Sequence, residues 1–125
     1  LPRPCIAIRH TIARAHCAPV AERLAALRGL RTMKPADVAP SLVPLLSDRE
    51  AKVRAGVAQL YCVFGAADAE AALVKALNDA DASVRYFAVL ACGALPGAKA
   101  AVSSLAASEK DAVVKDALAQ AMRSR

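Results

Sequence analysis

Asp79-Ala80-Asp81-Ala82-Ser83-Val84-Arg85 is the stretch that decides the fold, because its frame occurs three times in the chain. In each copy an acidic residue stands five positions before a Val, and a basic residue follows that Val. The copies begin at Asp48, Asp79 and Glu109, at intervals of 31 and 30 residues. Self-similarity at a fixed period of this length is typical of stacked repeats, in which each unit packs on its neighbours.

The composition favours helices throughout the chain. Apolar residues make up 57% of the 125 residues, aromatic residues make up only 3%, and Ala is the most frequent residue type. Ala is the best helix former, and its small side chain lets helices approach closely. No segment shows the alternation of apolar and polar residues that is typical of strands. We therefore expect an all-α fold, an α-solenoid of about four helical hairpins in one domain over residues 1–125.

Apolar residues at helical spacing predict eight helices that pair into four repeats. The predicted pairs are 4–17 with 19–31, 36–46 with 50–64, 67–78 with 82–95, and 98–107 with 111–123. The repeats therefore cover about 4–31, 36–64, 67–95 and 98–123. Pro44 should bend the third helix because proline removes an interior hydrogen bond, and Gly65 should end the fourth.

The second helices of the four pairs share buried columns when they are aligned. The first column reads Val20, Val53, Val84 and Val114. Four and seven positions later the columns read Leu24, Val57, Ala88 and Leu118, then Leu27, Leu60, Ala91 and Ala121. A single helical hairpin cannot bury such a face, so each pair needs its neighbours.

The best copy of the repeat also carries a family resemblance. Residues 77–93 read LNDADASVRYFAVLACG, with Asp followed five positions later by Val-Arg and then by alternating Ala. This segment resembles the short bacterial form of HEAT repeats, the kind also found in phycobilisome-lyase-like proteins. Residues 46–65 match nearly as well, and residues 107–121 keep the register with Glu109 and Lys115. The first repeat departs from the pattern, since position 21 is Ala where Arg is expected.

The resemblance implies a binding function more than a chemical one. In stacks of this kind the second helices line a concave face that receives a partner, so we expect a non-enzymatic scaffold for protein–protein interaction. Tyr86 is the strongest candidate contact because it is large and amphipathic among small side chains; alternatively, its ring lies over the neighbouring repeat. The candidate partner-binding residues are Glu22, Ala55, Gln59, Tyr86, Asp116 and Gln120.

The repeated acids and bases predict a structural feature, which we call the acid–base ladder. Each acid lies at the turn before a second helix, and each base lies one turn into that helix. We expect these residues to cap helix N-termini and to fix the register between repeats through ion pairs. Asp79 should pair with Arg54 or Arg85, and Glu109 with Lys115. The ladder comprises Asp48, Arg54, Asp79, Arg85, Glu109 and Lys115.

The net charge of +6 is carried by one end of the chain. Residues 1–34 hold seven bases and one acid (7 − 1 = +6), and residues 35–125 hold ten of each. Such asymmetry fits either a solvated terminal cap or contact with nucleic acid or an anionic surface. The scarcity of aromatic residues for base stacking disfavours nucleic acid. The basic patch comprises Arg3, Arg9, Arg14, Arg23, Arg28 and Arg31.

Candidate chemistry is sparse. Cys5, His10, His16 and Cys17 point in different directions on one helix, so we expect no zinc site there. Cys62 and Cys92 fall in apolar helical runs and should be buried thiols. We therefore predict no catalytic residue, metal or cofactor, and keep an enzyme subunit of lyase-like type as the alternative.

The setting of the protein is predicted from two features. No apolar run approaches the ~20 residues that a membrane-spanning helix needs. The cysteines form no Cys-x-x-Cys pair and no disulfide framework. A reducing, cytoplasmic location is therefore expected, and the oligomeric state is left open.

Overall fold

The computed structural model describes residues 19–123, without the side chains of 35–37 and 68. The all-α prediction is confirmed over this range, which contains seven α-helices and three short 3-10 segments and no strand. The predicted helix 4–17, which is the first helix of the predicted first repeat, lies outside the described residues. The division into four repeats therefore stays a prediction.

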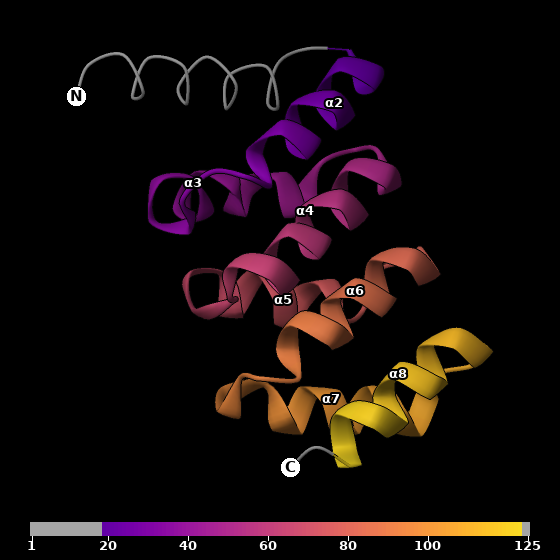
Figure 1. The fold of residues 1–125 in the computed structure, drawn as a ribbon. Coiled ribbons are helices and arrows are strands. Elements are labelled where there is room, and N and C mark those ends of the chain that lie inside the picture. The colour runs from indigo at the N-terminus through magenta and orange to yellow at the C-terminus, as the bar shows by residue number, and fades with distance from the viewer. Residues whose placement is uncertain (1–18, 124–125) are drawn as a thin grey trace.

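The helices form two rows that run the length of the stack (Figure 1). In one row each helix packs on the next, in the order α2, α4, α6 and α8. The bounds in this row are α2 Val20–Leu30, α4 Ala51–Phe64, α6 Ala82–Cys92 and α8 Ala112–Arg123. The other row holds α3 Pro35–Leu42, α5 Glu70–Ala76 and α7 Lys99–Ser108. The arrangement is an α-solenoid.

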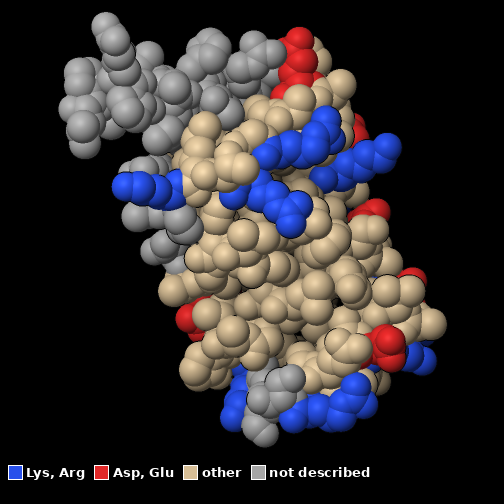
Figure 2. Space-filling model, in the orientation of Figure 1, with Lys and Arg blue, Asp and Glu red and all other residues tan. Residues whose placement is uncertain are grey.

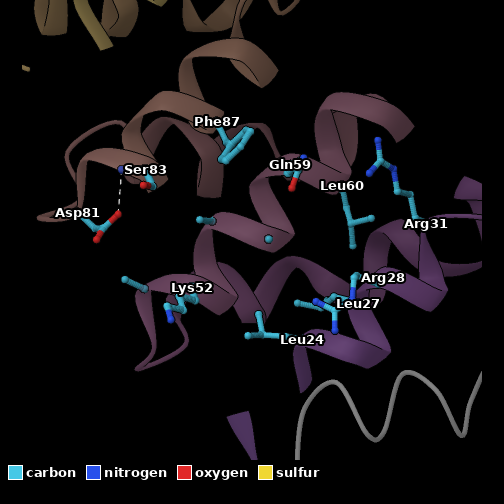
Figure 3. Close-up of a pocket in the computed structure, with 13 residues that line it drawn as sticks. Leu24, Leu27, Arg28, Arg31, Lys52, Gln59, Leu60, Asp81, Ser83 and Phe87 are labelled. Atoms are coloured by element: carbon cyan, nitrogen blue, oxygen red, sulfur yellow. Dashed lines mark hydrogen bonds between the residues drawn. The ribbon is translucent and has the colours of Figure 1, made fainter. Parts of the chain in front are cut away.

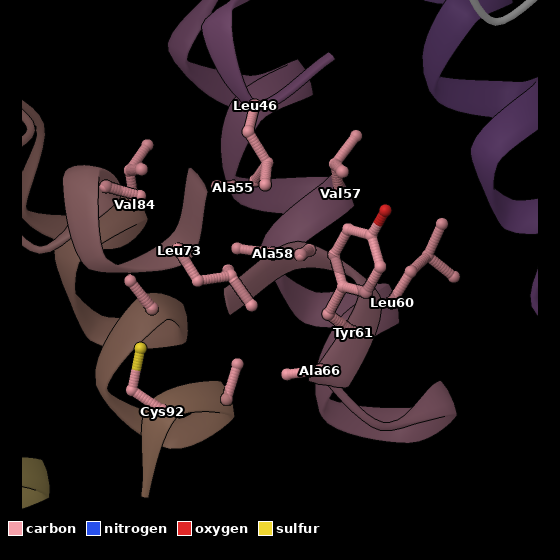
Figure 4. Packing of buried hydrophobic residues seen from close by; sticks show 14 of the residues in the cluster. Leu46, Ala55, Val57, Ala58, Leu60, Tyr61, Ala66, Leu73, Val84 and Cys92 are labelled. Carbon is pink, nitrogen blue, oxygen red and sulfur yellow. The ribbon is translucent and has the colours of Figure 1, made fainter. Parts of the chain in front are cut away.

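The core lies between the two rows and is built from aliphatic side chains (Figure 4). Leu73 of α5 is fully buried between α4 and α6, with Val57 and Val84 equally buried in those two helices. Tyr61 is the largest fully buried side chain, and its hydroxyl donates a hydrogen bond to the carbonyl of Ala39. The buried ring of Tyr61 is therefore packed in the core while its hydroxyl has a hydrogen-bond partner, and this bond joins α4 to α3.

Prolines and a glycine set the helix ends. The α-helix predicted over 36–46 ends at Leu42, and Val43–Ser47 continues as a 3-10 helix that contains Pro44. Proline removes a donor from the interior ladder, which explains the change. Gly65 ends α4 with φ of +94°, a conformation that residues with a Cβ rarely adopt. Two further 3-10 turns, Ala67–Ala69 and Pro96–Ala98, lead into α5 and α7.

The register of α2 differs from the alignment made on the sequence. Val20 and Leu24 are half-buried at the margin of the core, while Leu27 and Leu30 are fully buried. The buried residues Ala26, Leu27 and Leu30 have the spacing of Val57, Ala58 and Tyr61 in α4. Arg23 also pairs with the acid of the following repeat as Arg54 does, so α2 is displaced by two residues from that alignment.

Candidate functional site

An open groove with a volume of about 540 Å³ runs over α4, between α2 and α6 (Figure 3). The apolar side chains of its walls are Leu24 and Leu27 from α2 and Phe87 from α6. Ala55 and Gly56 of α4 contribute to its lining between those walls. Three consecutive helices of one row therefore build one concave surface.

Small side chains on α4 keep the groove open. A Cβ added to Gly56 would meet Leu27 Cδ1 at 3.4 Å, so α2 packs closely against α4 at this point. Ala55 is 8% exposed and adds only a methyl group to the surface. A larger residue at either position would fill the space between α2 and α6 or push the two helices apart.

The groove carries more positive than negative charge. Arg28 and Arg31, at the end of α2, and Lys52, at the start of α4, are exposed and line it. Asp81 is the acid of the lining, and its carboxylate accepts the backbone N–H groups of Ser83 (2.9 Å) and Val84 (3.3 Å). Figure 2 shows Lys and Arg gathered over α2 and α4 and an uncharged area below them on the same face.

Ion pairs join successive helices along one edge of this surface. Arg54 donates to both carboxylate oxygens of Asp79, from Nε at 2.8 Å and from Nη2 at 3.0 Å. Arg85 binds Glu109 in the same bidentate way, at 2.8 and 3.1 Å. Arg23 Nη2 donates to Asp48 Oδ1 at 3.1 Å. Each base therefore reaches the acid of the following repeat.

Each bidentate arginine also fastens the turn of its own repeat. Arg54 Nη1 donates to the carbonyls of Asp48 and Arg49 at 2.8 and 3.2 Å. The equivalent bonds run from Arg85 Nη1 to the carbonyls of Asp79 and Ala80 at 2.8 and 3.1 Å. One guanidinium thus joins two consecutive turns, a geometry that a lysine ammonium cannot reproduce.

Three placements differ from the sequence prediction of the acid–base ladder. Glu109 pairs with Arg85 of the preceding repeat and not with Lys115, because the base of one repeat lies beside the acid of the next. Arg23, predicted in the basic patch, is 9% exposed and pairs with Asp48. Asp81, which was given no role, is the residue whose side chain caps α6.

The ion pairs lower the pKa of two carboxyl groups. Burial disfavours the charged form of Asp79, but the hydrogen bonds from Arg54 and from the Asp81 N–H outweigh it and lower the pKa below the usual 3.8. The hydrogen bond from Arg85 lowers the pKa of Glu109 below its usual 4.5, against the effect of burial. Both groups are therefore carboxylates throughout the neutral range.

These lowered pKa values predict acid sensitivity. The unfolded chain binds the two protons at higher pH than the folded chain, so their contribution to stability is complete above pH 4.5 and lost as the pH falls through the folded values. Thermal melts between pH 7 and pH 3 should show this decline, and Glu109→Gln should flatten it. Asp116→Asn, on the exposed face of α8, is the control. A decline unchanged by Glu109→Gln would contradict the pairing.

The predicted partner-binding residues divide between the groove and other places. Ala55 and Gln59 line the groove, Ala55 buried and Gln59 exposed. Tyr86 is half-buried on α6, packs edge-to-face on Phe87 at 5.1 Å between ring centroids, and lines a hollow of about 310 Å³ with Val113 and Val114 of α8. Its ring therefore lies beside the next helix of the row. The remaining three, all exposed on α2 or α8, are Glu22, Asp116 and Gln120.

The basic patch is also divided. Arg28 and Arg31 line the groove, and Arg23 is in the acid–base ladder. Arg3, Arg9 and Arg14 lie outside the described residues, as do Cys5, His10, His16 and Cys17. Lys52 was not predicted and carries no motif that would have identified it. Phe87 is half-buried, and it both packs against the core and lines the groove.

The described part of the chain holds little that could perform chemistry. Cys92 is fully buried. Cys62, which was predicted to be a buried thiol, is an exposed residue. Its sulfur lies 3.4 Å from the carbonyl oxygens of Ala58 and Phe87, and desolvation raises the pKa of the thiol to about 11, which leaves it protonated at neutral pH. Within residues 19–123 no three His, Cys, Asp or Glu side chains gather as a metal site. None of the helices in this range combines the length and the apolar character that spanning a bilayer requires.

A family model described as HEAT repeats matches residues 42–123, which is more than half of the chain. No curated protein matched the sequence.

Proposed function

The chain belongs to the HEAT repeat family, and from this premise we propose that it is a non-enzymatic scaffold that binds a partner protein along the face of α2, α4, α6 and α8. Domains of this family generally mediate protein interactions. The groove over α4 is the observation that carries the proposal for this chain. It is concave, apolar between its walls and edged by exposed polar groups, which are the features of a protein-binding surface.

The groove lining favours binding over catalysis. Its ionisable side chains are Arg28, Arg31, Lys52 and Asp81. The single carboxylate is held by two backbone N–H groups of α6, and a general acid or base needs a carboxylate or imidazole directed at a substrate. Arg and Lys at the edge of an apolar surface are suited to orienting a partner and increasing its rate of association.

Site-specific photocrosslinking tests the proposal. A photoreactive amino acid placed at Gln59, exposed in the groove, should crosslink a protein in lysate of the source cells. The same amino acid at Lys75, exposed on α5 in the other row, is the matched control. Crosslinks of equal yield from both positions, or crosslinks from Gln59 to nucleic acid alone, would contradict a protein-binding face.

A further inference from the structure

We propose that the groove binds an acidic amphipathic helix of the partner protein. This inference rests on the proposed function and adds the chemistry of the partner. Two properties of the groove carry it: its shape, set by three neighbouring helices, and the sign of the charge along its α2 wall.

The shape of the groove fits one helix. It runs over α4, which has 14 residues, and has a helix on each side. A volume of about 540 Å³ accommodates several side chains but no folded domain. An amphipathic helix laid over α4 would place the apolar residues of one face against Leu24, Leu27 and Phe87. Its backbone can come close because Ala55 and Gly56 present almost no side chain.

The charge of the groove selects an acidic helix. Arg28 and Arg31 are on the α2 wall, and the ion pairs found among the described residues involve neither of them nor Lys52. Carboxylates on the flank of a bound helix can pair with these two guanidiniums in bidentate geometry. Asp81 is at the opposite wall and is already bonded to the α6 N-terminus. A bound helix therefore meets cations along α2.

Other occupants fit these observations less well. A second copy that met this one groove to groove would bring Arg28 and Arg31 of both copies together, which is unfavourable. A nucleic acid could bind the cations through its phosphates, but it would leave the apolar side chains of the groove without a contact. Phe87 is the single aromatic side chain in the lining on which a base could stack. Both alternatives are outcomes of the test below.

The probe is a hydrocarbon-stapled helical peptide of about 14 residues, matched in length to α4. It carries Leu at positions i, i+4 and i+7 and Glu along one flank, and a second version carries Lys in place of Glu. Fluorescence anisotropy should show the Glu peptide binding at least about tenfold more tightly than the Lys peptide. Equal affinity for the two peptides, or no binding of the Glu peptide, would overturn the proposal.

Variants assign the binding to the groove. The double substitution Arg28→Glu and Arg31→Glu should weaken the Glu peptide by about tenfold or more and reverse the preference between the peptides. Lys75→Glu with Lys99→Glu makes the same change of charge on exposed residues of α5 and α7 and should leave both affinities unchanged. Gln59→Trp should block the groove with its charge intact. If the control pair weakened binding equally, attraction to net charge alone would explain it.

The outcomes separate this inference from the proposed function. If the Glu peptide fails but Gln59 still crosslinks a protein, the acidic helix is wrong and the protein-binding face stands. If both fail, the proposed function is wrong as well. If a single-stranded DNA or RNA oligonucleotide displaces the peptide at comparable concentration, the groove recognises phosphate and the helix proposal is overturned.

Discussion

Replacing Leu73 by alanine is expected to lower the free energy of unfolding by about 3 kcal/mol, within the range of about 2–5 kcal/mol for buried leucines. The side chain of Leu73 is 0% exposed, and it lies between the two rows of helices (Figure 4). Alanine would leave a cavity bordered by α4 and α6, neither of which can move inward without breaking contacts with the other row. Urea denaturation followed by circular dichroism measures the loss.

Leu90→Ala is the matched control for this measurement. Leu90 is on α6 and is 39% exposed, so its truncation should cost less than about 1 kcal/mol. Equal losses at Leu73 and Leu90 would show that the rows do not enclose the core described above. A change in the denaturant slope would show that the substitution alters the surface exposed on unfolding or breaks two-state behaviour.

Asp79→Ala is expected to cost about 2–3 kcal/mol. The substitution removes two hydrogen bonds from Arg54 and the acceptor of the Asp81 N–H, and it leaves a guanidinium that is 17% exposed without its carboxylate. Breaking a fully buried pair costs about 3–5 kcal/mol, whereas an exposed pair contributes at most about 1 kcal/mol. Arg54 keeps two backbone carbonyls as acceptors, which limits the loss to a value between these.

Asp116→Ala provides the comparison for Asp79→Ala. Asp116 is an exposed acid on α8, so its removal makes the same change in net charge and should alter stability by less than about 0.5 kcal/mol. Thermal or urea denaturation of the two variants at pH 7 gives the comparison. A similar small effect at both positions would mean that the Asp79 pair adds nothing to stability.

The fold could be predicted from the sequence because its frame repeats. The acids at Asp48, Asp79 and Glu109 mark equivalent turns, and the helices between them begin and end within a few residues of the prediction. Local chemistry was also readable, since Gly65 ends α4 and Pro44 interrupts the third helix. Periodic apolar residues and turn residues act locally, so one sequence is sufficient to read them.

The partners within the acid–base ladder were harder to predict, because pairing depends on how far one repeat is displaced along the next. The pairs Arg54–Asp79 and Arg85–Glu109 span 25 and 24 residues. The same separation counted back from Asp48 leads to Arg23, which the residue frame alone had missed. The constant separation between base and acid was therefore present in the sequence. It predicts the pairs only when it is known that each base faces the following repeat.

The groove could be predicted only in part. Gln59 and Ala55 were expected on the binding face because they follow from the helix alignment, and both line the groove. Lys52 and Leu24 were not expected there, since the register of α2 against α4 is set by packing and differs by two residues from the sequence alignment. Which residues meet across three helices is a property of that packing and not of any one segment.

The ion pairs bear on function because they hold the walls of the groove. Arg54 binds Asp79 at the turn before α6, and Arg23 binds Asp48 at the turn before α4. The spacing of α2, α4 and α6 is therefore fixed at their N-terminal ends. A surface whose shape is set before binding loses less conformational entropy when it takes up a partner.

The most direct test is a double-mutant cycle between Arg54 and Asp79, which belong to neighbouring repeats. Arg54→Ala, Asp79→Ala and the double variant are unfolded in urea beside the parent chain. If the two side chains join the repeats as described, the double variant loses less than the sum of the single losses, by about 1–3 kcal/mol. Losses that add to within about 0.3 kcal/mol would contradict the pairing on which the fixed groove depends.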